Sequence, residues 1–140
     1  MEKTKLVWLK LSLVNLAIVA LLGFTLRSKI LFPIPFIDYR SFLSAHSHFA
    51  FSGWVGLALT TLLIYNLLPS QYSSKKFYLW ILIIMEVTSL GMAVSFPLQG
   101  YGFWSILFSS GYIVTNYVFA IVFIRDIVKT FLANCICIFI

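Results

Sequence analysis

The chain has 140 residues, of which 61% are hydrophobic and 10% charged, and its mean hydropathy is +1.01. Soluble domains are about half apolar and about a quarter charged, so this composition excludes an ordinary soluble domain and indicates an integral membrane protein. The formal net charge of +6 does not indicate nucleic-acid binding, because basic residues beside membrane spans set topology and meet anionic lipid.

The first apolar run covers residues 6–26. Lys10 lies in its first turns, and its long side chain can carry the charge to the membrane surface. A secretory signal peptide is the alternative, because the chain begins with basic residues. The apolar run is long for a signal peptide and no small-residue cleavage site follows it, which favours a retained span.

Three further apolar runs follow, at residues 42–68, 77–98 and 103–128. A backbone in lipid must satisfy its own hydrogen bonds, so each run is predicted to be a helix. Prolines and glycines mark the short connections between them. The sequence therefore predicts one all-α domain, a four-helix transmembrane bundle. The apolar tail at residues 129–140 is too short to cross a bilayer, and we interpret it as the start of a fifth span in a longer protein.

Orientation follows from the distribution of lysine and arginine. Seven of these residues flank the N-terminus, the second loop and the C-terminal end, and three lie in the first loop. Both termini are therefore predicted to be cytoplasmic. The first loop then faces outward, and the second span begins near the outer surface of what we interpret as a bacterial inner membrane.

The second span begins with the only two histidines of the chain, His46 and His48. Ionisable residues in a membrane are costly and usually face the bundle interior or a cavity. Neutral imidazole enters at lower cost and is a good ligand for iron, copper or zinc. Residues at i and i+2 of a helix point about 200° apart, so the two rings are predicted to serve different faces, one for a cofactor or metal and one for a hydrogen bond or second site.

The small residues Ala50 and Gly53 lie below His46 on the same face, whereas a fuller face lies below His48. A flat macrocycle needs small residues near its axial ligand, which favours His46 as the ligand. Plain helix packing also selects small residues and is the alternative. Arg40 precedes the histidines and could pair with haem propionates. Its alternatives are a role in topology or an ion pair with Asp38.

The segment "YRSFLSAHSHFAFSGWVGLAL" resembles the second transmembrane helix of haem–copper oxidase subunit I, closest to the b-type-haem cytochrome c oxidases, the nitric oxide reductases and small oxidase-like membrane proteins. The pattern H-x-H-x-x-x-x-G-W carries this resemblance. It implies a low-spin haem b near the outer membrane face. His46 is then the axial ligand and His48 the alternate, with Arg40 near the propionates and Gly53 beside the ring.

The chain has no histidine outside the second span, whereas the family uses further histidines for copper and for the high-spin haem. We therefore expect at most the low-spin haem half of such a subunit, with Met85 or Met92 as candidates for the second ligand. The protein would be a fragment or accessory of a respiratory electron-transfer complex rather than an oxidase by itself. Expected partners are the lipid bilayer, other respiratory subunits or a second copy.

Two alternatives belong to other classes of protein. One is a cofactor-free membrane scaffold or assembly subunit. The other is a metal site made by His46 and His48 from paired protomers. Glu86 is a further candidate, because it is an acid in the middle of the third apolar run. It is either a proton relay or a group that contacts a ligand of the cofactor, or it is a protonated carboxyl that is hydrogen-bonded to a neighbouring helix.

Overall fold

The computed structural model describes residues 2–138, and side chains as far as residue 132. Every element in this part of the chain is a helix. The helices are α1 (Glu2–Leu31), α2 (Tyr39–Phe49), η1 (Ala50–Gly56), α3 (Leu57–Leu67), α4 (Ser70–Ser73), α5 (Lys76–Gln99) and α6 (Phe103–Ile138).

Among the described residues, four helices are long and apolar enough to cross a membrane. The second of them, Tyr39–Leu67, is one continuous rod made of α2, the π-helical segment η1 and α3. At about 1.5 Å per residue, all four exceed the roughly 30 Å of hydrocarbon. The prediction of four helices with the length and hydropathy of membrane spans is confirmed, and each helix extends past at least one predicted limit.

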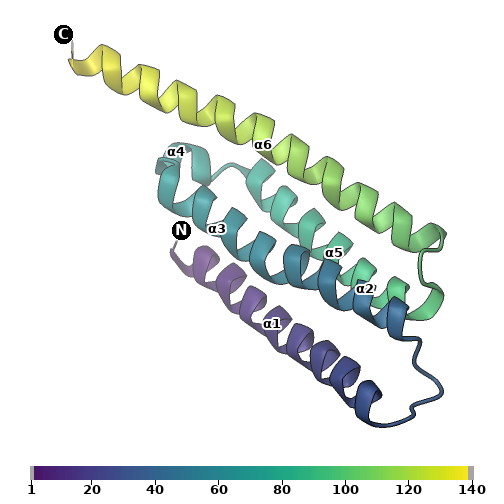
Figure 1. Cartoon of the computed structure of the whole chain (residues 1–140). Coiled ribbons are helices and arrows are strands. Elements are labelled where there is room, and N and C mark those ends of the chain that lie inside the picture. Colours follow the sequence, from purple (N-terminus) through teal and green to yellow (C-terminus); the bar gives the residue numbers. More distant parts are fainter. Residues whose placement is uncertain (1, 139–140) are drawn as a thin grey trace.

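In Figure 1 the four long helices follow one another in the order α1, the rod α2–η1–α3, α5 and α6. The rod α2–η1–α3 packs against α1 on one side and α5 on the other, and α6 lies along α5. Only 11% of the most apolar stretch of α6 is buried, against 44% for α5. The predicted bundle is therefore open along α6. Both termini lie at the same end of the molecule (Figure 1).

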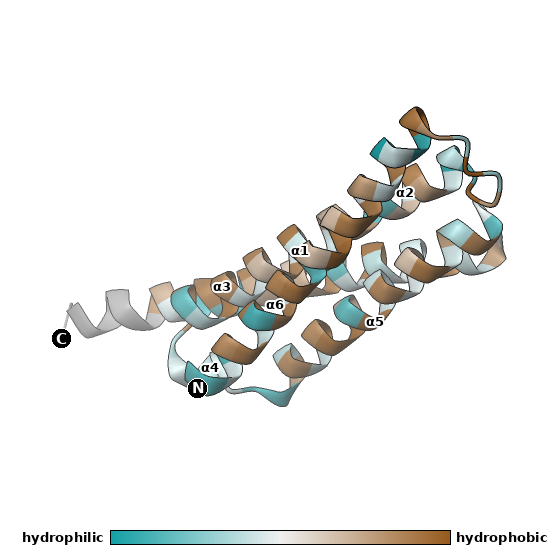
Figure 2. Cartoon of the chain, turned by 90° about the horizontal axis from the view of Figure 1, so that it is seen from below, coloured by the Kyte–Doolittle hydropathy of each residue, from teal (hydrophilic) through white to brown (hydrophobic). Residues whose placement is uncertain are grey.

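Many large apolar side chains of the long helices are exposed, and hydrophobic residues are spread along each of these helices (Figure 2). This distribution is expected where lipid tails, rather than water, surround the helices. Two clusters of buried apolar side chains lie between the helices. The larger includes Leu57, Tyr78 and Met85, and the smaller contains Ala45, Met92 and Phe96. Buried polar residues of α5, Glu86 and Ser89, separate the two clusters along that helix.

Local sequence signals account for the ends of the helices. Asp38 caps the N-terminus of α2, where its carboxylate accepts hydrogen bonds from the backbone N–H of Ser41 (2.8 Å) and from its hydroxyl (2.6 Å). These bonds, the hydroxyl bond first, lower the pKa of Asp38. Gly100 ends α5 at φ +61°, a left-handed conformation that glycine adopts without a steric cost.

Beyond residue 128, the described part of the apolar tail continues α6 without a break as far as Ile138. Residues 139 and 140, and the side chains from residue 133 on, lie outside the description. The tail is thus an extension of the fourth helix over the part that is described.

Candidate functional site

The two histidines of α2 point to different neighbours, as their spacing predicts. The ring of His46 faces α1, where its Nδ1 lies 3.1 Å from the carbonyl oxygen of Val19. The ring of His48 faces α5 and stacks on Phe96, with the ring centroids 4.7 Å apart and the planes 12° apart.

His46 is part of the contact between α1 and α2. A Cβ added at Gly23 would lie 3.1 Å from Cε1 of this ring, so the glycine makes room for the imidazole against the backbone of α1. A carbonyl oxygen only accepts, so Nδ1 carries the proton and donates it to Val19. A bond of this kind fixes the tautomer and the orientation of a histidine ring.

The space above Gly53 is filled by the chain itself. A Cβ added at Gly53 would lie 2.5 Å from the ring of Phe49, and the Phe49 side chain is fully buried. Sequence reasoning gave this glycine the role of clearing space for a macrocycle. In the structure Gly53 makes room for Phe49 and for the close approach of α1, whose Asn15 bonds to its carbonyl oxygen.

A groove opens beside His48, between the rod α2–η1 and α6. We call it the histidine groove. Its volume is about 290 Å³, and it is lined by Ser47, His48, Phe51, Ser52, Met92, Ser109, Tyr112 and Ile113. Met92 belongs to α5 and is only 2% exposed. The groove therefore combines an imidazole, a thioether and several hydroxyl groups within the span.

Met92 and Met85 were both candidates for a second axial ligand. Met92 lines the histidine groove together with His48. Met85 is fully buried in the other apolar cluster, among residues such as Leu57 and Tyr78. The structure thus places one of the two methionines, Met92, at the same groove as a histidine.

A polar cluster joins three spans next to the π-helical segment. The amide nitrogen of Asn15 lies 2.7 Å from the carbonyl oxygen of Gly53, and 3.1 and 2.9 Å from the two carboxyl oxygens of Glu86. Both side chains are buried, and Glu86 is 7% exposed. A π-helix shifts the backbone bonding to i→i+5 and is frequent at functional sites. We call these groups the Asn15 cluster.

The Asn15 cluster is close to the histidine groove along the chain. Ser52 precedes Gly53 and lines the groove. Its hydroxyl donates to the carbonyl oxygen of His48 at 2.7 Å, and its own carbonyl oxygen lies 3.5 Å from the hydroxyl of Tyr112 on α6. One segment of η1 thus has the buried acid on one side and the groove on the other.

Arg40 is exposed in the first turn of α2 and is not among the residues that line the histidine groove. Asp38 was its suggested ion-pair partner. The hydrogen bonds of that carboxylate go to Ser41 instead. Arg40 lies about two turns before His48 on the same helix, toward the end of the span.

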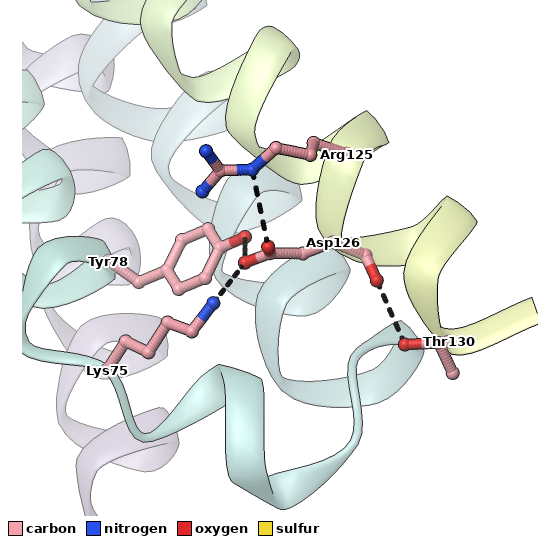
Figure 3. A network of polar contacts seen from close by, with 5 residues as sticks. All are labelled: Lys75, Tyr78, Arg125, Asp126 and Thr130. Atoms are coloured by element: carbon pink, nitrogen blue, oxygen red, sulfur yellow. Dashed lines mark hydrogen bonds and ion pairs between the residues drawn. The ribbon is translucent and has the colours of Figure 1, made fainter. Parts of the chain in front are cut away.

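A second polar cluster, drawn in Figure 3, lies at the start of α5, far from the end of that helix where Phe96 packs against His48. Asp126 of α6 accepts hydrogen bonds from Lys75 Nζ at 2.8 Å and from the Tyr78 hydroxyl at 2.9 Å. Arg125 Nε lies 3.8 Å from the other carboxylate oxygen. We call this the Asp126 cluster. It joins the start of α5 to α6, and sequence reasoning missed it.

Among the described side chains, no group of three or more histidine, cysteine, aspartate or glutamate residues could hold a metal ion. Comparisons with protein-family models, with curated proteins and with solved structures found no match.

Proposed function

We propose that this protein is a haem-binding membrane protein similar to a part of haem–copper oxidase subunit I, and that the histidine groove holds a b-type haem. The observation that carries the proposal is that His48 and Met92, from different helices, line the same groove. Imidazole and thioether are a known pair of axial ligands for haem iron. In this proposal His48 is the ligand and His46, bonded to Val19, positions the helix.

The residues that line the histidine groove are suited to contact part of a haem. Phe51 and Ile113 supply apolar contact, and Ser47, Ser52 and Ser109 supply hydroxyls. A volume of about 290 Å³ is at the small end of the roughly 300–1,000 Å³ of ligand pockets. A whole haem is larger than that, so the proposal needs space from the open side along α6 or from a partner.

When bound, a haem supplies one-electron chemistry. The chain's own part is then to orient the His48 ring, which Phe96 supports by stacking, and to keep the groove largely apolar. Arg40 is available for the propionates at the end of the span. Two histidines are too few for a haem and also for the copper centre of an oxidase, so the proposed role is electron transfer or an accessory function in a respiratory complex.

The proposal includes an orientation of the chain in the membrane. Seven basic residues and two acidic ones lie toward the end that carries both termini, and three basic residues and one acidic one lie in the first loop. The positive-inside rule then puts the termini in the cytoplasm. His46 and His48 lie toward the outer face in this orientation, and the membrane is a bacterial inner membrane.

The visible spectrum tests the proposal. Protein purified in detergent from cells with sufficient haem should show a b-type α band in the reduced-minus-oxidised difference spectrum. In Met92→Leu the haem should remain, but the band should shift and the ferric protein should become partly high-spin, because one axial ligand is lost. Unchanged spectra in this variant would contradict the role of Met92.

Two other outcomes would support the alternatives. A colourless preparation without metal would support a cofactor-free scaffold or assembly subunit. Copper or zinc without haem would support a site between protomers that uses His46 and His48.

A further inference from the structure

A second cavity lies far from the histidine groove, at the end of the molecule that carries the termini. Its volume is about 280 Å³, and it is lined by Thr4, Tyr65, Ser73, Ser74, Lys75, Lys76 and Leu79. These residues come from α1, α3, α4 and the start of α5. The cavity is therefore formed by the packing of three spans and a loop. It is a shaped site rather than a group of charged residues on an open surface.

The lining suits a negatively charged group with several oxygen atoms. Two lysines and several residues with hydroxyl groups line this one cavity. Asp126 binds Lys75 at 2.8 Å and offsets its charge, so Lys76 supplies the uncompensated charge at the rim. Lys3 and Lys5 in the first turns of α1 add to the positive potential, against Glu2 alone.

The surface around the cavity continues into the apolar part of the span. Leu79 forms part of the lining and is itself exposed, as are Phe77 and Trp80. Tryptophan side chains such as Trp80 gather at the level of lipid headgroups. A ligand with a charged head and an apolar tail would therefore match both the cavity and the adjacent helix surface.

We propose that this cavity binds the phosphate-bearing headgroup of an anionic phospholipid, with the acyl chains along the exposed face of α5. Basic pockets between membrane helices bind such headgroups. The site is separate from the histidine groove and goes beyond the proposed haem function. It does not depend on whether haem is bound.

Native mass spectrometry of the full chain, exchanged into micelles with either phosphatidylglycerol or phosphatidylcholine, tests this inference. The wild type should retain phosphatidylglycerol and release phosphatidylcholine. In Lys76→Gln, retention of phosphatidylglycerol should fall about fivefold, the effect of one basic residue near an anionic lipid. Lys76 is exposed, so the variant should fold, and its helical circular dichroism provides the check.

Lys129→Gln is the matched control, because Lys129 has the same charge at the same end of the molecule but is not among the lining residues. It should retain phosphatidylglycerol like the wild type. Equal losses in the two variants would overturn the inference in favour of diffuse surface attraction. Equal retention of both lipids would also overturn it. Displacement of the lipid by excess inorganic phosphate would identify a site for free phosphate instead.

Discussion

Replacing Asn15 with leucine is expected to lower the free energy of unfolding by about 2–4 kcal/mol. Its amide nitrogen serves the carbonyl oxygen of Gly53 and both carboxyl oxygens of Glu86. Interhelical hydrogen bonds in membranes average only about 0.6 kcal/mol each. The expected decrease in the free energy of unfolding is larger than this, because leucine leaves a buried carboxyl and a buried carbonyl without this donor. Unfolding by a denaturing detergent, followed by circular dichroism, measures the change.

A double-mutant cycle with Glu86 provides the control. Glu86→Leu should remove the need for the donor at the carboxyl, so the pair Asn15→Leu and Glu86→Leu should lose less stability than the sum of the single changes. A coupling of about 1–2 kcal/mol is expected for groups in one hydrogen-bonded cluster. Strict additivity would mean that the two side chains do not interact in the folded protein.

Replacing Lys75 with methionine is expected to cost about 3 kcal/mol, the lower limit for breaking one side of a buried ion pair. The Asp126 side chain is 1% exposed and the Lys75 side chain 38% exposed. The change therefore leaves the carboxylate buried without its main cation. The Tyr78 hydroxyl and Arg125 remain beside it, which keeps the cost at the lower limit. The same unfolding measurement applies.

The reverse change should be milder. In Asp126→Asn the amide oxygen can still accept from Tyr78 and Lys75, and the partly exposed ammonium can turn toward water. We expect a loss of about 1 kcal/mol. This account requires that the buried carboxylate of Asp126 depends on the Lys75 ammonium more than the partly exposed ammonium depends on the carboxylate. A larger loss of stability in Asp126→Asn than in Lys75→Met would contradict it.

The spans could be predicted from the sequence because apolar runs of about 20 residues have only one solution in lipid, a helix. The order of packing could not. Nothing in the periodicity of residues 103–128 indicates that α6 would lie along α5 and stay largely exposed. The hydrophobic effect does not discriminate between helices in lipid, so packing there depends on details such as Gly91, where an added Cβ would lie 2.6 Å from the Phe108 ring.

The divergence of His46 and His48 follows from helix geometry and was predictable. What each ring meets was not, because it depends on residues far away in the sequence. Gly23 lies 23 positions before His46 and receives its ring, and Phe96 lies 48 positions after His48 and stacks on it. The small residues below His46, which favoured this histidine as a ligand, serve close contact within the protein.

Asn15 and Asp126 could have been recognised in the sequence as candidate sites of interhelical hydrogen bonds. Each is a polar residue inside an apolar run, as Glu86 is, and each has a partner from another span. Their partners could not be read from the sequence, because an acid and an amide 71 positions apart share no local pattern. The π-helical segment at Ala50–Gly56 also leaves no mark in the sequence.

We propose that His48 binds haem and that His46 positions the helix. The haem content of His48→Ala and His46→Ala, measured per polypeptide as the pyridine haemochrome, tests these two roles most directly. His48→Ala should purify without haem but keep its helical content. His46→Ala should be less stable, because the hydrogen bond from its ring to Val19 and the packing of the ring against Gly23 are lost, but it should keep haem. Haem retained in His48→Ala and lost in a folded His46→Ala would contradict the assignment of the ligand to the histidine groove.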